Sequence, residues 1–308
     1  MSITRPRRTR AALALVALFV AAAARPAIAA DDYTVVFDRP YKVGDAYHVE
    51  ATSTDRQDRT VQIPDMPAQS ETVKKKTTLA GDVKVLAVTE KGRPTKLTLT
   101  IANLEISEGD GPASKPLKPG QVLVLTRNGD EKVAALEGGG DLPPAVAAAV
   151  NELVSAADPQ SPTEDESFGT KDRKKVGDEW DVNAESLRAS SLKQGIPVAK
   201  DGVRGKVKLV EVRREGGVES GVYDLNVTAV GEKGGKMPKL PPGFAIDELT
   251  LKVTGHKVAP LDPALHTTAE TLDVAMNLKV AGAVPNAGLV TITVKAAGTK
   301  EHKFSAVK

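Results

Sequence analysis

The chain has 308 residues, of which 41% are hydrophobic and 27% are charged, and it contains no cysteine. Its length allows one or two buried cores, while the missing cysteine excludes disulfides, thiol nucleophiles and thiolate metal sites. The formal net charge of +2 gives no electrostatic reason to expect nucleic acid or an anionic membrane as a partner.

Residues 1–29 have the pattern of a secretory signal peptide. Four arginines precede an apolar run from Ala11 to Ala24, and Ala27-Ile28-Ala29 forms a small-residue cleavage site that ends at Ala29. The apolar run is shorter than the roughly 20 residues that a membrane-spanning helix needs. Cleavage would remove five arginines and no acidic residue, which takes the net charge from +2 to −3. We therefore expect an exported protein, periplasmic or extracellular, with no transmembrane segment after signal removal.

After a short β-type run from Tyr33 to Phe37, an octet of sequence appears that recurs later in the chain. Residues Lys42–Val49 read Lys-Val-Gly-Asp-Ala-Tyr-His-Val, and residues Lys175–Val182 read Lys-Val-Gly-Asp-Glu-Trp-Asp-Val. Gly-Asp is typical of a turn, and the alternation of apolar and polar side chains after it indicates a half-buried strand. The matched rings of Tyr47 and Trp180 are expected in the core, with a ligand site as the alternative.

Further echoes follow in the same order in both halves. They pair Gly81–Leu86 with Gly205–Val210, Leu117–Gly120 with Leu240–Gly243, and Lys132–Leu136 with Lys257–Leu261. Three ordered echoes predict a duplicated β-rich unit. In the second copy the alternation extends the predicted strand to Ala184.

Strands and turns account for most of the remaining sequence. The first strand runs into a polar stretch over 55–62, and the two prolines within 63–67 then favour a loop. Hairpins are predicted over 79–106 and 205–230, and Asn128-Gly129 is a strong hairpin signal. Near the end, apolar residues alternate over 272–280 and 290–294 across a turn, so the chain closes on a β-hairpin.

One amphipathic helix is predicted, from about Leu142 to Ala156. Asp141 is a suitable N-cap, prolines are tolerated in the first turn, and the alanines favour helix. The apolar stripe of this helix contains Leu142, Val146, Ala149, Val150 and Leu153.

We therefore expect a mainly β protein: an antiparallel curved sheet, half-barrel or barrel made of two similar halves, with one amphipathic helix. The expected organisation is a signal peptide over 1–29, a first β-rich repeat over 30–157 that ends in the helix, an acidic connector over 158–166, and a second β-rich repeat over 167–308.

No catalytic or cofactor motif was found, and we expect neither a cofactor nor a metal. The sequence lacks a Gly-x-Ser-x-Gly elbow, a glycine-rich phosphate loop and a His-Glu-x-x-His pair. The stretch from Asp178 resembles the start of a calcium loop, but Ser186 stands where glycine is needed and Leu192 where the closing glutamate belongs. His266 and Glu270 could pair on a metal only if the region were helical.

The octet, the Leu-x-Pro-Gly segment and the Gly-x-Asp/Lys-Val-Lys hairpin resemble an uncharacterised family of exported bacterial β-rich proteins with Val-Gly-Asp-x-Trp/Tyr strand starts. The resemblance covers most of residues 33–260. It implies a secreted β-rich protein and brings no known activity. A weaker, fold-level analogy is to the periplasmic lipoprotein carriers, in which a bent sheet shelters acyl chains under helices.

Three functions remain open. The first is a non-catalytic exported protein that binds or carries an apolar small molecule or lipid in a concave sheet. Its candidate ligand-binding residues are Tyr47, Trp180, Leu142, Val146 and Val150. The second is an envelope scaffold or protein-interaction module. The third is a hydrolase that uses carboxylates contributed from both halves, because the spacing of such carboxylates is set in space and not in sequence.

Overall fold

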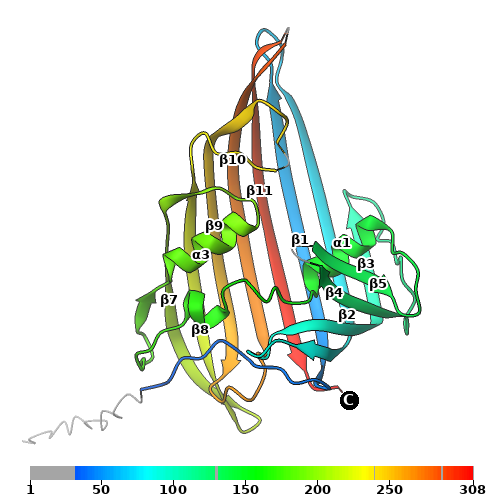
Figure 1. Cartoon of the computed structure of the whole chain (residues 1–308), viewed down its shortest axis with the longest axis vertical. Helices are drawn as coiled ribbons and strands as arrows, with labels where there is room; N and C mark the ends of the chain where they lie inside the picture. The colour runs from blue at the N-terminus through cyan, green and yellow to red at the C-terminus, as the bar shows by residue number, and fades with distance from the viewer. Residues whose placement is uncertain (1–31, 129–130, 239, 286, 308) are drawn as a thin grey trace, which may run out of the picture. The chain divides into compact units, whose positions relative to one another are not determined.

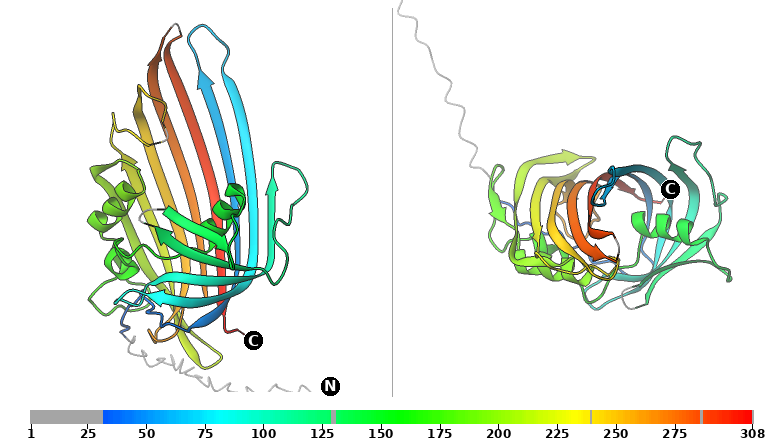
Figure 2. Two further views of the ribbon diagram at one scale, coloured as in Figure 1. Left: turned by 45° about the vertical axis from the view of Figure 1, so that its right-hand side comes forward. Right: turned by 90° about the horizontal axis from the view of Figure 1, so that it is seen from above.

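A computed structural model describes residues 32–307, apart from residues 129, 130, 239 and 286. The predicted signal peptide and its cleavage site at Ala29 lie outside the described residues. Residues 32–308 form one compact unit built on a single antiparallel sheet of eleven strands (Figure 1). The strands lie in the order β5-β4-β3-β2-β1-β11-β10-β9-β8-β7-β6. The sheet is curved but open, with β5 and β6 as its edges (Figure 2). The mainly β prediction is confirmed, and the sheet does not close into a barrel.

The strands are long, and several span more than fifteen residues. They are β1 (Ala46–Gln62), β2 (Gln69–Val88), β3 (Pro94–Glu108), β4 (Val122–Asn128), β5 (Glu131–Leu136), β6 (Glu179–Asp181), β7 (Val198–Glu215), β8 (Val218–Gly231), β9 (Phe244–Pro260), β10 (Ala269–Val284) and β11 (Gly288–Ser305).

Strand β1 continues through the polar stretch over 55–62, because it is paired on both sides. It pairs with β2 as far as Val61 opposite Gln69, and with β11 as far as Gln62 opposite Thr291. The loop predicted over 63–67 follows immediately. The predicted closing hairpin is β10–β11.

The two octets have the same turn geometry. Gly44 and Gly177 have φ angles of 97° and 96°, a region that favours glycine. In each turn the aspartate side chain accepts a hydrogen bond from the lysine amide three residues earlier, at 2.7 Å for Asp45 and 2.8 Å for Asp178. Tyr47 lies opposite Val83, and Trp180 lies opposite the matching Val207. Such agreement is what a copied module would keep, and the duplication itself stays a prediction.

The halves diverge beyond these turns. In the first, β4 and β5 form the hairpin that Asn128-Gly129 predicts, whereas the matching part of the second half is the single strand β9. The alternation predicted to Ala184 ends early, because β6 stops at Asp181 and Asn183 caps a helix instead. The run from Tyr33 to Phe37 is not a strand. It is an extended segment with one bridge, Tyr33 to Lys174.

The described residues form three helices where one was predicted: α1 (Pro144–Leu153), α2 (Glu164–Phe168) and α3 (Ala184–Lys193). Helix α1 is the predicted one, slightly shorter, and its apolar stripe is buried. Its N-cap is Pro143, which makes no side-chain hydrogen bond, so the prediction of Asp141 as the cap was wrong. Helix α2 begins inside the predicted acidic connector, where Thr163 and Glu166 form a capping box.

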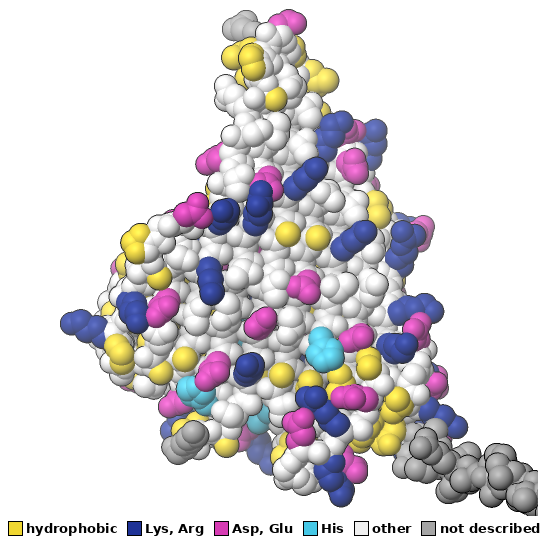
Figure 3. All heavy atoms as spheres, turned by 180° about the vertical axis from the view of Figure 1, so that it is seen from behind, with side chains coloured by type: hydrophobic (Ala, Val, Ile, Leu, Met, Phe, Trp, Pro, Cys, Tyr) yellow, Lys and Arg dark blue, Asp and Glu magenta, His cyan; other side chains and the backbone are white. Residues whose placement is uncertain are grey.

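The helices lie on the concave face of the sheet (Figure 2), and the opposite face carries interspersed charged side chains (Figure 3). The buried core has three parts. One packs α1 against β1 to β5. A second packs Trp180, Phe37 and Val35 onto β7, β8 and β9. A third joins Phe244, Ile246 and neighbours at the end of the sheet where β10 turns into β11.

We expect Trp180→Ala to lower the free energy of unfolding by about 3–5 kcal/mol. The side chain is 8% exposed, its ring lies 6.5 Å from the Tyr223 ring, and its Nε1 donates a 2.7 Å hydrogen bond to the Phe168 carbonyl. Urea denaturation measures the change. Trp180→Phe, which keeps most of the apolar volume, should cost less, and an unchanged midpoint for Trp180→Ala would contradict the packing argument.

Candidate functional site

A groove of about 530 Å³ lies between helix α3 and the concave face of strands β7 to β10. Its walls are mostly apolar, and its polar residues come from α2, α3 and its C-cap, β9 and β10. The apolar lining residues are Phe37, Phe168, Leu187, Ile196, Val203, Leu225, Val227, Ala229, Leu251, Val253, Leu272 and Val274, and the polar ones are Glu164, Ser190, Ser191, Gln194, Lys257 and Glu270. The strand residues face the groove because side chains on alternate positions share one face of a sheet.

Helix α3 is fixed at both ends. At its start, the Asn183 side chain accepts a hydrogen bond from the Ser186 amide at 3.1 Å, and the Ser186 hydroxyl lies 2.9 Å from that of Ser167 in α2. At its end, Lys193 forms a 2.6 Å ion pair with Asp158. In its middle, Arg188 donates to the Val198 carbonyl at 3.2 Å and Leu187 packs on the second core. These contacts hold the helix over the sheet, and the groove lies beneath it.

Helix α2 is held by the extended segment before β1. The Asp38 carboxylate accepts hydrogen bonds from the Glu164 and Asp165 amides at 3.0 and 3.3 Å. In return the Asp165 carboxylate accepts one from the Phe37 amide at 2.6 Å. Burial raises the pKa of Asp165 above its ordinary value, and the nearby Asp38 charge adds to this rise. These contacts place Glu164 and the Phe37 ring at one end of the groove.

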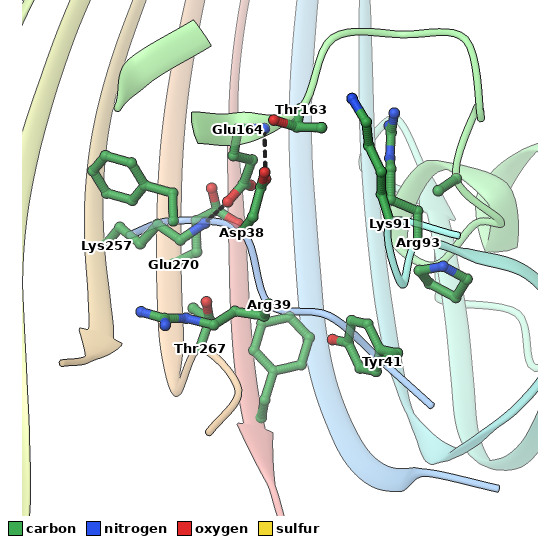
Figure 4. Close-up of a pocket in the computed structure, with 14 residues that line it drawn as sticks. Asp38, Arg39, Tyr41, Lys91, Arg93, Thr163, Glu164, Lys257, Thr267 and Glu270 are labelled. Carbon is green, nitrogen blue, oxygen red and sulfur yellow. Dashed lines mark hydrogen bonds and ion pairs between the residues drawn. The ribbon is translucent and has the colours of Figure 1, made fainter. Parts of the chain in front are cut away.

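That end of the groove contains a buried lysine. Lys257 on β9 is 5% exposed and forms an ion pair with Glu164, while its Nζ lies 5.8 Å from the centre of the Phe37 ring. Burial opposes its positive charge, but the carboxylates of Glu164 and Glu270 outweigh that effect and raise its pKa above the ordinary value. Lys257 is therefore a charged group at the end of an apolar groove, and Figure 4 shows it pointing toward these two acids.

A smaller polar cavity of about 210 Å³ adjoins this end. It shares Phe37, Glu164, Lys257 and Glu270 with the groove and adds basic residues from two other segments, among them Arg39 and Arg93 (Figure 4). Arg39 donates to the backbone carbonyls of Val36 and Pro260 at 2.8 and 2.6 Å. The apolar groove thus opens at one end onto hydrogen-bonding and charged groups.

Two carboxylates converge elsewhere on the concave face. The Ser53 hydroxyl lies 2.8 Å from the Asp55 carboxylate and 2.6 Å from that of Glu152 on α1. Burial and the neighbouring Glu152 charge raise the pKa of Asp55. Lys75 and Lys300 lie 3.8 and 3.5 Å from Glu152, so two cations neutralise the pair. Both acids belong to the first half, whereas the hydrolase hypothesis required acids from both halves.

The residues predicted as ligand contacts lie elsewhere. Tyr47 packs against Tyr41 and Phe304, with ring centres 5.7 and 5.9 Å apart. Trp180 is buried in the second core. Leu142, Val146 and Val150 are buried in the first core and face the sheet beneath α1. The structure brings none of these five residues to the lining of the groove.

Sequence alternation could have located the polar end of the groove. Lys257 falls on the same strand face as Leu251 and Val253, and Glu270 falls on the same face as Leu272 and Val274. A charged residue in phase with an apolar face is the signal of a buried, paired charge. The contribution of α3 could not be found in this way, because the predicted strand extended to Ala184 and no helix was predicted over the residues that follow.

Within the described part of the chain, no three histidine, aspartate or glutamate side chains are grouped so that they could hold a metal ion. His266 stacks on Tyr41 with ring centres 4.2 Å apart, and Glu270 lines the groove. None of the helices among the described residues has the length and apolar character needed to cross a membrane.

No family model matches the chain, and no curated protein matches it. Solved structures with some likeness include a lipovitellin structure titled for lipid–protein interactions (10% identity, TM-score 0.31), which covers 87% of this chain and 26% of that one. A LolA superfamily protein from Nitrosomonas europaea covers 87% of this chain and 89% of its own at 8% identity and a TM-score of 0.15. A mutant porin of Rh. blastica covers 82% and 99% at 11% identity and a TM-score of 0.19. At these scores the likenesses carry no argument about function, and the family resemblance noted from the motifs is not confirmed.

We expect Asp158→Asn to lower the free energy of unfolding by about 1–3 kcal/mol at pH 7. The Asp158 side chain is 9% exposed. Burial alone would raise its pKa, but hydrogen bonds from Lys193, the Gln160 amide and Ser161 hold that pKa well below its ordinary value. Because the folded-state pKa is depressed, the stabilisation is present above the unfolded pKa of about 3.9 and is lost as the pH falls through the folded value.

Chemical denaturation of both proteins between pH 7 and pH 3 measures this difference. Asp172→Asn is the control, since Asp172 is 82% exposed in its ion pair with Lys174 and such pairs contribute little. A wild-type advantage over Asp158→Asn that stayed constant down to the lowest pH would contradict the assignment.

Proposed function

We propose that the protein is a non-catalytic, exported binding protein that holds an apolar or amphipathic small molecule, such as a lipid acyl chain, in the groove beneath α3. The observation that carries the proposal is the groove of about 530 Å³ with twelve apolar lining residues. Small-molecule sites are typically concave, mostly apolar cavities of about 300–1,000 Å³ with a few placed polar groups.

The arrangement of charge supports an amphipathic ligand over a purely apolar one. The groove is apolar along the strands and ends at Lys257, Glu164 and Glu270, next to the polar cavity that contains Arg39 and Arg93. A chain bound along the strands would release ordered water from apolar surface, while a polar head at this end could hydrogen-bond to charged groups.

The two other hypotheses receive less support. An envelope scaffold would need a partner surface but no open cavity, and the groove is then unexplained. For a hydrolase, the Asp55–Glu152 pair is the best candidate, and its two lysine neighbours suit an ionic contact that holds α1 to the sheet. We therefore propose a structural role for that pair and no catalytic activity.

Ligand binding is tested by titrating the protein with a fluorescent fatty acid and displacing the probe with unlabelled palmitate. We expect saturable, displaceable binding by the wild type. Ser190→Trp, which places a ring in the groove from α3, is expected to weaken binding at least tenfold, or by about 1.4 kcal/mol.

Ala189→Trp is the matched control, because Ala189 is the neighbouring residue of α3 and is exposed outside the groove. Its affinity should stay within about twofold of the wild type, equivalent to about 0.4 kcal/mol. Equal affinities of the two variants, or no saturable binding by a folded wild type, would reject the groove as the site.

A further inference from the structure

The end of the sheet farthest from the octet turns is apolar. There the loop after β1 and the turn between β10 and β11 lie side by side, since Gln62 pairs with Thr291 and a Cβ added to Gly288 would lie 3.5 Å from Pro64. We call this surface the apolar tip and define it by Ile63, Pro64, Met66, Pro67, Val284, Pro285 and Leu289. Figure 3 shows hydrophobic side chains gathered at this end of the molecule.

Two side chains of the tip are unusually exposed for their type. Met66 is 48% exposed and Leu289 is 63% exposed, one on each turn. Beneath them, Ile63 and Val284 pack on the third core, which fixes the turns on a rigid base. Exposed apolar side chains on a firmly held projection mark an interaction surface more than a folding defect.

Charge is nearly absent from this end of the sheet. Between Lys279 and Lys295 the sequence has no charged residue, and between Arg59 and Glu71 it has only Asp65. Strands β2, β1, β11 and β10 are therefore uncharged on both faces at this end of the sheet. Elsewhere the convex face carries charges throughout (Figure 3), so the uncharged end is a local feature.

Three backbone carbonyls of the tip, those of Ile63, Met66 and Val284, accept hydrogen bonds from within the two turns. The Gln62 side chain donates to the carbonyls of Ile63 and Met66 at 2.9 and 3.0 Å, and the Met66 amide donates to the Ile63 carbonyl at 3.2 Å. On the other turn the Ala287 amide donates to the Val284 carbonyl at 3.1 Å. The three prolines have no amide hydrogen to satisfy.

The scarcity of charge and the exposed Met66 and Leu289 fit hydrocarbon. A charged side chain is costly inside a bilayer, whereas an apolar one is stabilised there. We propose that the apolar tip inserts into the surface of a lipid bilayer.

An apolar track joins the tip to the groove. Every second residue of β10 on the concave face is apolar or glycine, from Leu272 and Val274 in the groove, through Met276 and Leu278, to Val284 at the tip. At about 3.3 Å per residue this track spans roughly 40 Å. The middle of this track is not an open path, because Leu278 and Val280 are buried in the third core. Insertion of the tip does not depend on the proposed function.

Binding to neutral phosphatidylcholine vesicles tests the insertion, by flotation of the protein without residues 1–29, since that apolar run would itself bind lipid. The described compact unit lies wholly within the remaining chain. We expect the wild type to float with the vesicles, also at high salt. The double variant Met66→Asp with Leu289→Asp should lower the partition coefficient at least tenfold.

Val43→Asp is the matched control, because Val43 is 65% exposed and precedes β1 at the opposite end of the sheet. It should partition like the wild type. Asp65→Asn should strengthen partitioning, since it removes the single charge of the tip and asparagine tolerates the φ angle of 61° at this position. Met66→Trp should add a tryptophan emission that shifts to the blue on vesicle binding and is quenched by brominated lipids. The wild type, whose emission comes from Trp180, provides the reference.

A wild type that stays unbound, or a folded double aspartate variant that floats equally well, would overturn the proposal. The fatty-acid titration separates the two ideas. Vesicle binding without saturable fatty-acid binding would reject the groove as the ligand site and support insertion of the tip. Saturable fatty-acid binding by a protein that does not bind vesicles would support the groove as the ligand site and reject insertion of the tip.

Discussion

An open sheet of eleven strands, most of them long, has a large apolar concave face, and the described chain has little helix to cover it. Helix α1 covers the part formed by β1 to β5, and α2 and α3 stand over the part formed by β7 to β10. Since α1 and α3 have ten residues each and α2 has five, part of the face stays uncovered. The groove lies where apolar strand residues face α3 and are not fully covered by it.

The buried Lys257 belongs to the same arrangement. A lysine on an apolar strand face is costly unless it is paired, because burial removes the water that stabilises its charge. Here α2 brings Glu164 over the lysine, and β10 supplies Glu270 beside it. The short helix α2 thus compensates a charge on the sheet, and in doing so it sets where the apolar part of the groove ends.

The sequence indicates the architecture well and the site poorly. Period-two alternation identified segments of most of the long strands, but it did not find β9 or the polar parts of β1, β2 and β11. The repeated Gly-Asp turns were placed correctly. Both signals are local. Helix α3 was missed because Trp180, Val182 and Ala184 continue the strand pattern, whereas Asn183 caps a helix in the folded chain. The extended segment from Tyr33 to Phe37 was also misassigned, because its apolar residues pack under α2 without a strand partner. Such packing depends on contacts more than a hundred residues apart.

The pairing of β1 with β11 has a consequence for how the protein is made. These strands stand at the centre of the sheet and align His48 with Ser305, which joins the two ends of the described chain. Without β11, the remaining strands would form two separate sheets, β1 to β5 and β6 to β10. Contacts between segments so far apart in the sequence form slowly. The two sheets can be joined only after β11 has been synthesised, because β11 lies between them. Until then, β1 and β10 each lack one strand partner, so each of the two sheets has an additional unpaired edge.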